Sequence, residues 1–268
     1  MVQDHWTDHK IIVTGGATGL GAATVAAFAR LGARVVFCGL DEDMSDDVAA
    51  LLSDRILYRP CDVRDERAVA QFVDYSVRQM GGLTGAVNAA AISHHAGKLA
   101  DLRPAMVEDV WRTNVMGVWY AMRHQITAML AYHDSDHMPD QLKGGAIINV
   151  ASILSAEPAQ WMAAYGMSKY AVAGLSETAA LDYQDSPIRI NAVSPGPIKT
   201  PMLDRALADV DGDMSKFAGG FPPGGPADAT VIADLFTRLM GQEGRHIRGK
   251  NIILSGDGTP QEDIFRQS

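Results

Sequence analysis

Short apolar runs rich in β-branched residues alternate along the chain with longer segments that repeat apolar residues at helical spacing. The first run is KIIVT, and the segment GLGAATVAAFARLG follows it closely. Such runs predict strands, and a period of about 3.6 residues predicts helices. The predicted strands span residues 10–14, 34–39, 55–60, 84–90, 145–152, 188–194 and 251–256. The predicted helices span residues 19–32, 44–53, 66–81, 104–132, 162–184 and 227–241.

This alternation predicts the fold class. Helices that connect successive strands give a parallel sheet with helices on both faces, and strands covered on both faces are almost wholly apolar. We therefore predict an α/β fold of three layers, with a seven-stranded parallel sheet, in a single domain over residues 1–268. In such sheets ligands bind beyond the carboxyl ends of the strands. The segments that follow the strands are thus where functional residues are expected.

The first of these segments is TGGATGLG, residues 14–21, which joins the first strand to the first helix. Gly15, Gly19 and Gly21 let the backbone turn tightly and approach a ligand closely. The free N–H groups at the start of the helix favour an anion, usually a pyrophosphate in this position. The spacing differs from the common Gly-x-Gly-x-x-Gly fingerprint, and a glycine-rich helix entry without a ligand is the alternative.

Further motifs follow at the ends of later strands. In order along the chain they are CDV (61–63), NVMG (114–117), INVAS (148–152), YGMSK (165–169) and NAVSPGPIKT (191–200). Together with TGGATGLG, they occur in the order and at the intervals of the short-chain dehydrogenase/reductase family. The chain therefore resembles this family from about Lys10 to Gly258, with a Rossmann fold that binds NAD(P).

The resemblance implies which residues form the site. Asn114, Ser152, Tyr165 and Lys169 would form a catalytic tetrad. The residues implied in cofactor binding are Gly15, Thr18, Gly19, Leu20, Gly21, Asp62, Val63, Asn88, Ala90, Tyr165, Lys169, Pro195, Gly196, Ile198 and Thr200. Asp62 would bond the adenine and Asn88 would lie beside the adenosine. Lys169 would also bond the nicotinamide ribose, and Ile198 and Thr200 would hold the carboxamide.

The chemistry of such a tetrad begins with a phenol. A free tyrosine has a pKa of about 10, and Lys169 lies one helical turn beyond Tyr165, so its charge would favour the phenolate. An oxidised nicotinamide ring would add a second positive charge, and the two together would bring the pKa of Tyr165 down to about 7. Tyr165 would then exchange a proton with an alcohol or a carbonyl oxygen, while Ser152 would orient that oxygen. Asn114 would hold a water linking Lys169 to solvent. Three of the four residues also have a structural interpretation: a strand-end serine, a buried tyrosine and a helical asparagine bonded to the backbone.

The chain departs from the family pattern at three places, of which two concern the cofactor and one concerns the end of the last strand. NAAA (88–91) replaces Asn-Asn-Ala-Gly, so Ala91 adds a methyl group and restricts the backbone, and SGDG (255–258) replaces the usual Asp-Gly-Gly. After the second strand, Gly39 and Leu40 occupy the positions where the family often has an NAD-selecting Asp or an NADP-selecting Arg. The acidic Asp41 follows them. We expect NAD(H), with NADP(H) possible and Asp41 as the acidic contact, unless Asp41 only begins a helix.

The substrate end is less informative. Residues 198–226 form a long Gly- and Pro-rich segment that resembles the family's substrate lid, and long loops at a ligand edge are often functional. The expected substrate contacts are His94, Ser152, Trp161, Met162 and Met202. The apolar side chains of the segment 198–226, together with Trp161 and Met162, favour a medium-sized, partly apolar secondary alcohol or ketone. His133, Asp134, Asp136 and His137 have the residue types of a metal cluster, but a solvated loop is the preferred interpretation, so no metal site is predicted.

Composition limits the partners. The chain has 268 residues and a net charge of −9, which argues against nucleic acid and anionic membranes. Only two cysteines are present, no apolar run reaches the roughly 20 residues of a membrane span, and the start of the chain lacks an apolar signal core. We expect a cytoplasmic oxidoreductase, and the resemblance implies a homotetramer or homodimer built on the helices at 104–132 and 162–184. The alternatives are an NADPH-dependent ketoreductase and a non-catalytic sensor or scaffold that binds the cofactor.

Overall fold

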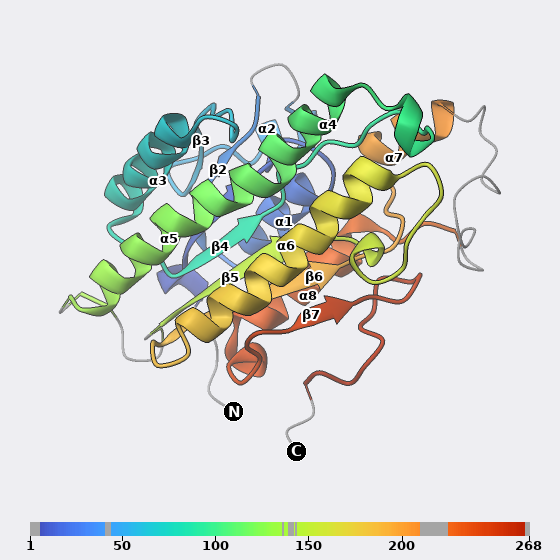
Figure 1. Ribbon diagram of the computed structural model, residues 1–268. Coiled ribbons are helices and arrows are strands. Elements are labelled where there is room, and N and C mark those ends of the chain that lie inside the picture. The colour runs from blue at the N-terminus through green and yellow to red at the C-terminus, as the bar shows by residue number, and fades with distance from the viewer. Residues whose placement is uncertain are drawn as a thin grey trace.

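A parallel sheet of seven strands forms the centre of the computed structural model (Figure 1), which describes residues 6–40, 44–135, 137, 138, 142, 144–209 and 225–265. Along the sheet the strands lie in the order β3-β2-β1-β4-β5-β6-β7. Their bounds are β1 Lys10–Thr14, β2 Arg34–Cys38, β3 Ile56–Tyr58, β4 Gly85–Asn88, β5 Gly145–Val150, β6 Ile188–Ser194 and β7 Asn251–Ile253.

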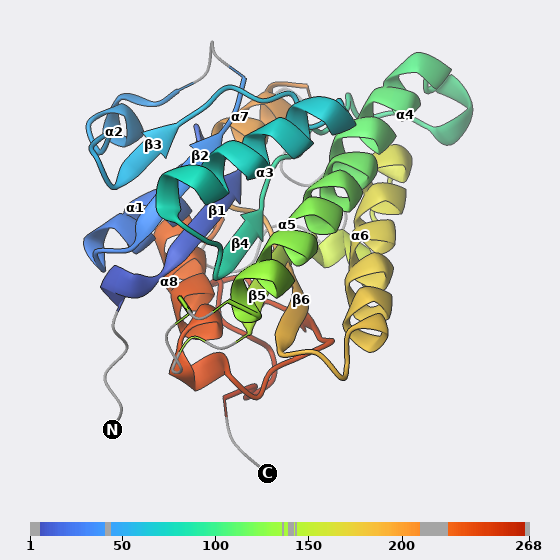
Figure 2. The ribbon, with the colours of Figure 1, turned by 90° about the vertical axis from the view of Figure 1, so that its left-hand side faces the viewer.

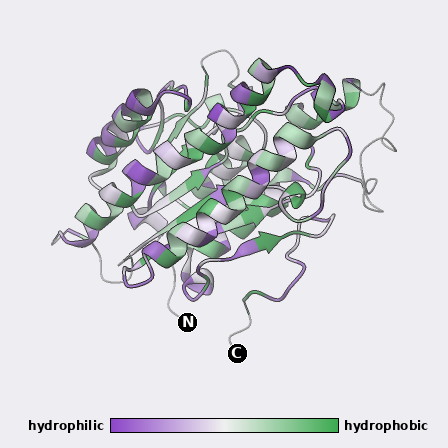
Figure 3. Ribbon diagram, viewed as in Figure 1, coloured by the Kyte–Doolittle hydropathy of each residue, from purple (hydrophilic) through white to green (hydrophobic). Residues whose placement is uncertain are grey.

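Helices cover both faces of the sheet (Figure 2). The helices on one face are α3 (Glu66–Met80), α5 (Gly117–His133) and α6 (Ala163–Asp182), and those on the other are α1 (Gly19–Arg30) and α8 (Ala229–Met240). Each face has its own apolar core, with Phe72 and Met129 in one and Phe28 and Phe236 in the other. The strands between them are largely apolar (Figure 3). The predicted three-layer α/β fold is confirmed.

Several element bounds differ from the sequence-based prediction. The second helix, α2, is only Asp46–Ala49. The helix expected over 104–132 consists of α4 (Pro104–Trp111), a π-helical turn at Arg112–Met116, and then α5. Within the segment expected to be an irregular lid, Pro201–Ala208 forms a further helix, α7. Thr200 at its N-cap and Pro201 at its first position are ordinary helix-start signals that the sequence analysis did not use.

The strand order places the site. β1 lies between β2 and β4. The strands that follow β1 run towards one edge of the sheet, and the strands that follow β4 run towards the other edge. The crevice at such a reversal, beyond the carboxyl ends of the strands, is where ligands bind in open parallel sheets. The glycine turn that follows β1 lies at this reversal.

A chain of buried amides joins the strands beneath that crevice. Asn88 at the end of β4 and Gln125 of α5 exchange two side-chain hydrogen bonds of 2.9 and 3.0 Å. Asn88 also donates to Asn149 of β5 at 2.8 Å, and Asn149 donates to Ser176 of α6 at 2.9 Å. Because buried polar groups are costly unless bonded, this set specifies how β4, β5 and the two helices fit together.

A partly buried arginine lies at the opposite end of the sheet. The Arg189 guanidinium, near the start of β6, donates to the carbonyl oxygens of Leu239 at 2.9 Å and Gly244 at 2.8 Å, with a longer bond of 3.3 Å to Met240. These carbonyls belong to the C-terminal end of α8 and the turn after it, where a cation is favourable. Burial, with a contribution from Arg248, lowers the pKa of Arg189 to about 10.

Two further observations concern the class of protein. In the described ranges, no helix is long and apolar enough to span a membrane. Cys38 and Cys61 are both buried and free.

Candidate active site

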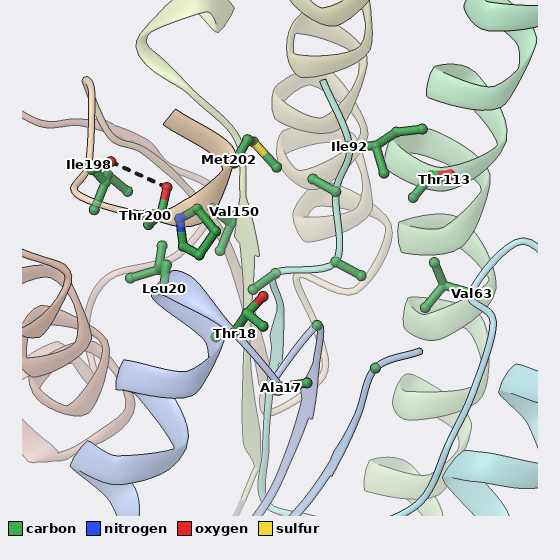
Figure 4. Close-up of a pocket in the computed structure, with 18 of the residues that line it drawn as sticks. Ala17, Thr18, Leu20, Val63, Ile92, Thr113, Val150, Ile198, Thr200 and Met202 are labelled. Atoms are coloured by element: carbon green, nitrogen blue, oxygen red, sulfur yellow. Dashed lines mark hydrogen bonds between the residues drawn. The ribbon is translucent and has the colours of Figure 1, made fainter. Parts of the chain in front are cut away.

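A cavity of about 340 Å³ opens at the carboxyl ends of the central strands. Leu20, Val150 and Thr200 lie on one side of it and Ile92, Thr113 and Val63 on the other (Figure 4). The predicted site residues on its wall are Gly15, Thr18, Gly19, Leu20, Gly21, Asp62, Val63, Ala90, Ser152, Tyr165, Lys169, Pro195, Gly196, Ile198, Thr200 and Met202. Motifs from distant parts of the sequence thus meet in one cavity.

The glycine turn is shaped for close approach. Gly15 has φ +69°, and a Cβ added to it would lie 2.6 Å from the backbone N of Ala90. A Cβ on Gly21 would lie 1.9 Å from the carbonyl oxygen of Gly15. The N-cap residue Thr18 makes no side-chain cap hydrogen bond, so the first N–H groups of α1 stay free for an anion. These residues fit the pyrophosphate of a dinucleotide.

Ser152, Tyr165 and Lys169 form the reactive end of the cavity wall. Ser152 follows β5, hydrogen-bonds the Tyr165 hydroxyl, and accepts a bond of 3.2 Å from the backbone N of Leu154. Tyr165 and Lys169 lie one turn apart near the start of α6, with Lys169 Nζ 5.4 Å from the centroid of the Tyr165 ring. Lys169 Nζ donates to the carbonyl oxygen of Val150, the last residue of β5, at 2.8 Å.

Burial controls the ionisation of this pair. It raises the pKa of Tyr165 to about 12, although the hydrogen bond with Ser152 lowers it in part. Burial also lowers the pKa of Lys169 to about 8. In the protein without cofactor the pKa of Tyr165 is therefore raised and not lowered, because loss of water outweighs the distant ammonium. The expected drop also depends on the positive charge of an oxidised nicotinamide, so it stays a prediction. The phenol is a proton donor here, and making it a base requires more positive charge near its oxygen.

The sequence of the chain matches the short chain dehydrogenase family over residues 9–211. The chain belongs to this family. It is therefore an oxidoreductase that uses NAD or NADP and acts on CH–OH groups.

Named relatives extend over most of the chain. It is 34% identical over 213 residues to 2,5-dichloro-2,5-cyclohexadiene-1,4-diol dehydrogenase of Sphingobium indicum, covering 80% of this chain and 81% of that protein. It is 34% identical over 257 residues to cis-4-hydroxycyclohexanecarboxylate dehydrogenase of Sinomonas cyclohexanicum, covering 95% and 98%. The solved structure of ElxO with NADP bound matches at a TM-score of 0.79 and 26% identity, covering 93% of this chain and 97% of that one.

In this short-chain dehydrogenase, Asn114 lies behind the cavity wall. It belongs to the π-helical turn, and such turns are frequent at functional sites. Its amide accepts a bond from the backbone N of Ile92 at 2.8 Å and donates to the carbonyl oxygen of Ile92 at 2.9 Å and to Ser168 Oγ at 3.0 Å. Asn114 thereby ties the Ile92 segment to α6 and positions one wall of the cavity.

Three cofactor-site residues have unexpected surroundings. The Asp62 carboxylate, which lines the cavity, binds the Arg64 guanidinium at 2.7 and 3.0 Å, and this neighbour lowers the pKa of Asp62. The Asn88 side chain lies in the buried amide chain and not on the cavity wall. Asp41 is outside the described residues. Ala91 is on the wall without backbone strain, since Trp161 is the one described non-glycine residue with positive φ.

Three of the five expected substrate contacts do not line the cavity. Met202 is on the wall, but His94, Trp161 and Met162 are not. His94 is buried, and its Nδ1 donates to the carbonyl oxygen of His95 at 2.7 Å. Trp161 has φ +63°, and its carbonyl oxygen accepts a bond from the Gly97 N at 3.1 Å. These residues shape the loops around the mouth.

The structure also adds wall residues that the sequence analysis did not select. They include Ile92, Thr113, Arg64 and Arg205. Arg205 lies on α7, and Asp209 just beyond α7 pairs with His95 Nδ1 at 2.8 Å across the mouth. The helix-start signal at Thr200 and Pro201 could have predicted α7, but no local pattern predicts that it lies over the glycine turn.

Proposed function

We propose that this enzyme acts on a secondary alcohol of a six-membered carbocycle with a second polar group at carbon four, or on the corresponding ketone. Two relatives at 34% identity support this substrate class, since their names specify a cyclohexadiene-1,4-diol and a 4-hydroxycyclohexanecarboxylate. The cavity supports it as well, because the apolar Ile92 and Met202 line the same cavity as Ser152 and Tyr165. An apolar ring with one reacting hydroxyl fits such surroundings.

The arrangement of Ser152 and Tyr165 carries the proposal. When bound, the nicotinamide supplies the hydride acceptor or donor. Ser152 donates a hydrogen bond to the substrate oxygen and fixes its position beside the phenol. Tyr165 is protonated at neutral pH because its pKa is about 12, so it delivers the proton during carbonyl reduction. During alcohol oxidation it would have to be in its phenolate form to receive the proton of the alcohol. Lys169 holds its ammonium beside this exchange, and Asn114 holds the cavity wall.

Replacing the phenol tests this assignment. We expect Tyr165→Phe to lower kcat/KM on cis- and trans-4-hydroxycyclohexane derivatives by about 10³-fold, as loss of a positioned acid–base group does. Tyr170→Phe is the matched control, since Tyr170 is an exposed tyrosine on the same helix. NADH binding by both variants, followed by fluorescence, should match the wild type. Activity of Tyr165→Phe within tenfold of the wild type would refute the role.

We also propose NAD(H) as the preferred cofactor. Gly39 and Leu40, which line the cavity just after β2, offer no cation for a 2′-phosphate, and Arg64 is neutralised by Asp62. A 2′-phosphate without a basic partner is disfavoured. Titration with NADH and NADPH should give at least tenfold tighter binding of NADH. The substitution Leu40→Arg should reduce this difference between the two Kd values. Equal or tighter NADPH binding by the wild type contradicts this choice and favours the NADPH-dependent ketoreductase.

The organisation of the chain is part of the proposal. We infer one domain over residues 1–268 with a substrate lid at 198–226, of which residues 210–224 lie outside the described residues. Exposed Trp119 on α5 and Leu181 on α6 support a homodimer or homotetramer through these helices. Light scattering after size-exclusion chromatography tests this, and a monomer at micromolar concentration would contradict it. A cytoplasmic location also stays a prediction.

A further inference from the structure

Helix α7 lies directly over the glycine turn. A Cβ on Gly19, the first residue of α1, would be 3.2 Å from Thr200 Cγ2 and 3.9 Å from Pro201 Cδ. Thr200 is the N-cap of α7 and Pro201 its first residue. The start of α7 therefore contacts the helix N-terminus that attracts a pyrophosphate. Any charge on this face of α7 acts on that position.

Arg205 is on this face of α7. It follows Pro201 by four residues, so the two side chains share a face about one turn apart. Side chains on a helix lean towards its N-terminus, which directs the Arg205 side chain back over Pro201 and towards Gly19. Consistent with this direction, Arg205 lines the same cavity as Gly19 and Gly21.

The charge of Arg205 has no partner among the described residues. Asp209, at the i+4 position where an ion-pair partner usually lies, pairs with His95 Nδ1 at 2.8 Å. Asp204 is adjacent in sequence and so on another face of the helix. The other two cations of the cavity wall are engaged, Arg64 by the Asp62 carboxylate and Lys169 by the Val150 carbonyl. Arg205 is thus the one wall cation whose side chain makes no hydrogen bond or ion pair within the described residues.

We propose that Arg205 is a cofactor-binding residue whose guanidinium, brought by α7, binds the pyrophosphate of the nicotinamide dinucleotide. The inference rests on the function proposed above. A planar guanidinium matches phosphate oxygens with paired hydrogen bonds, and it complements the N–H groups of α1 from the opposite side. Because Arg205 belongs to α7, the same contact draws this helix onto the bound cofactor and couples cofactor binding to the substrate end of the cavity.

Binding measurements with two substitutions test the proposal. We expect Arg205→Gln to raise the Kd for NADH about tenfold, as loss of one charge-assisted contact at a partly exposed site does, and Arg205→Lys to recover part of the loss. Lys199→Gln is the matched control, since it removes the same charge from an exposed residue beside α7 that does not line the cavity. Its Kd should stay within twofold of the wild type.

Fragments of the cofactor locate the contact. Competition against NADH should show that ADP-ribose, which keeps the pyrophosphate, loses about the same factor with Arg205→Gln. Adenosine, which has no phosphate, should bind the variant and the wild type equally. A tenfold loss confined to NADH and ADP-ribose, with a weaker salt dependence of the Kd, supports the proposal.

Two outcomes overturn the inference while leaving the proposed function intact. One is an unchanged NADH Kd in Arg205→Gln. The other is a KM of Arg205→Gln that rises for a carboxylate-bearing cyclohexanol and not for a neutral cyclohexanediol, while the Kd for NADH is unchanged. That result would make Arg205 a contact for the anionic group of the substrate. Failure of the wild-type protein to bind NADH or NADPH would instead refute the proposed function itself.

Discussion

A buried lysine and a partly buried arginine lie at opposite ends of the sheet and are held in different ways. Lys169 is at the carboxyl end, beside the last residue of β5, and Arg189 is near the amino end of β6. Burial lowers the pKa of both, to about 8 for the lysine and about 10 for the arginine. Neither has a carboxylate partner among the described residues, so both depend on carbonyl oxygens.

The difference lies in how many donors are used. The Arg189 guanidinium bonds the carbonyl oxygens of Leu239, Met240 and Gly244, which fixes it as part of the scaffold. Lys169 has three N–H donors, and the described residues show one bond, to Val150. A buried ammonium with unused donors facing a cavity is available for a ligand. Unused hydrogen-bond capacity therefore separates the cation of a site from the cation of a scaffold.

Removing the Lys169 charge should give the largest effect. We expect Lys169→Met to lower kcat/KM by about 10³-fold, because Tyr165 loses its nearest cation. The folded protein should survive, since methionine fills similar space without a buried charge. Steady-state kinetics and circular dichroism check both parts. A kcat/KM within tenfold of the wild type would show that Lys169 has a structural role, as Arg189 does.

Removing the Arg189 charge should act on stability instead. Arg189→Met leaves the carbonyl oxygens at the end of α8 unbonded in a buried position, which we expect to cost about 4 kcal/mol of unfolding free energy. Urea denaturation measures this, and kcat/KM per folded molecule should stay within twofold of the wild type. An Arg189→Met variant that is as stable as the wild type but inactive would contradict the structural role of Arg189.

The pH dependence of stability should give a smaller effect. The pKa of Lys169 is lowered from 10.5 to about 8, so between these values the unfolded chain holds a proton that the folded chain has lost. Folding stability attributable to Lys169 therefore rises with pH across this window. The unfolding free energy of the wild type minus that of Lys169→Met should therefore rise by roughly 3 kcal/mol from pH 8 to pH 10.5. Urea midpoints across this range, compared between the two proteins, make the measurement, and a constant gap would contradict the lowered pKa.

The sequence was most informative where structure follows from short-range patterns. The apolar runs predicted the seven strands. The glycine turn and the Tyr165–Lys169 spacing identified residues that the structure places on the wall of one cavity. Strand ends were predicted too long, as with 251–256 against Asn251–Ile253, where Leu254 N still bonds the Ser194 carbonyl oxygen at 3.0 Å but a turn then begins. The π-helical turn at Arg112–Met116 has no such local signal.

What the sequence could not predict depends on contacts between distant residues. The position of Arg205 over Gly19 follows from how α7 packs, and the setting of Asn88 follows from Gln125 and Asn149. The ionisation of Tyr165 follows from burial, which a four-residue spacing does not reveal. A motif identifies the chemical groups, while tertiary packing decides their partners and pKa values.

The buried amide chain of Asn88, Gln125, Asn149 and Ser176 also restricts how this protein can be altered. No single member can be changed to an apolar residue without leaving a neighbour's donor or acceptor unbonded. A mutant library that varies these positions one at a time should therefore return few folded clones. A library that varies them as a set can recover matched combinations, so the four positions are expected to change together across diverged sequences.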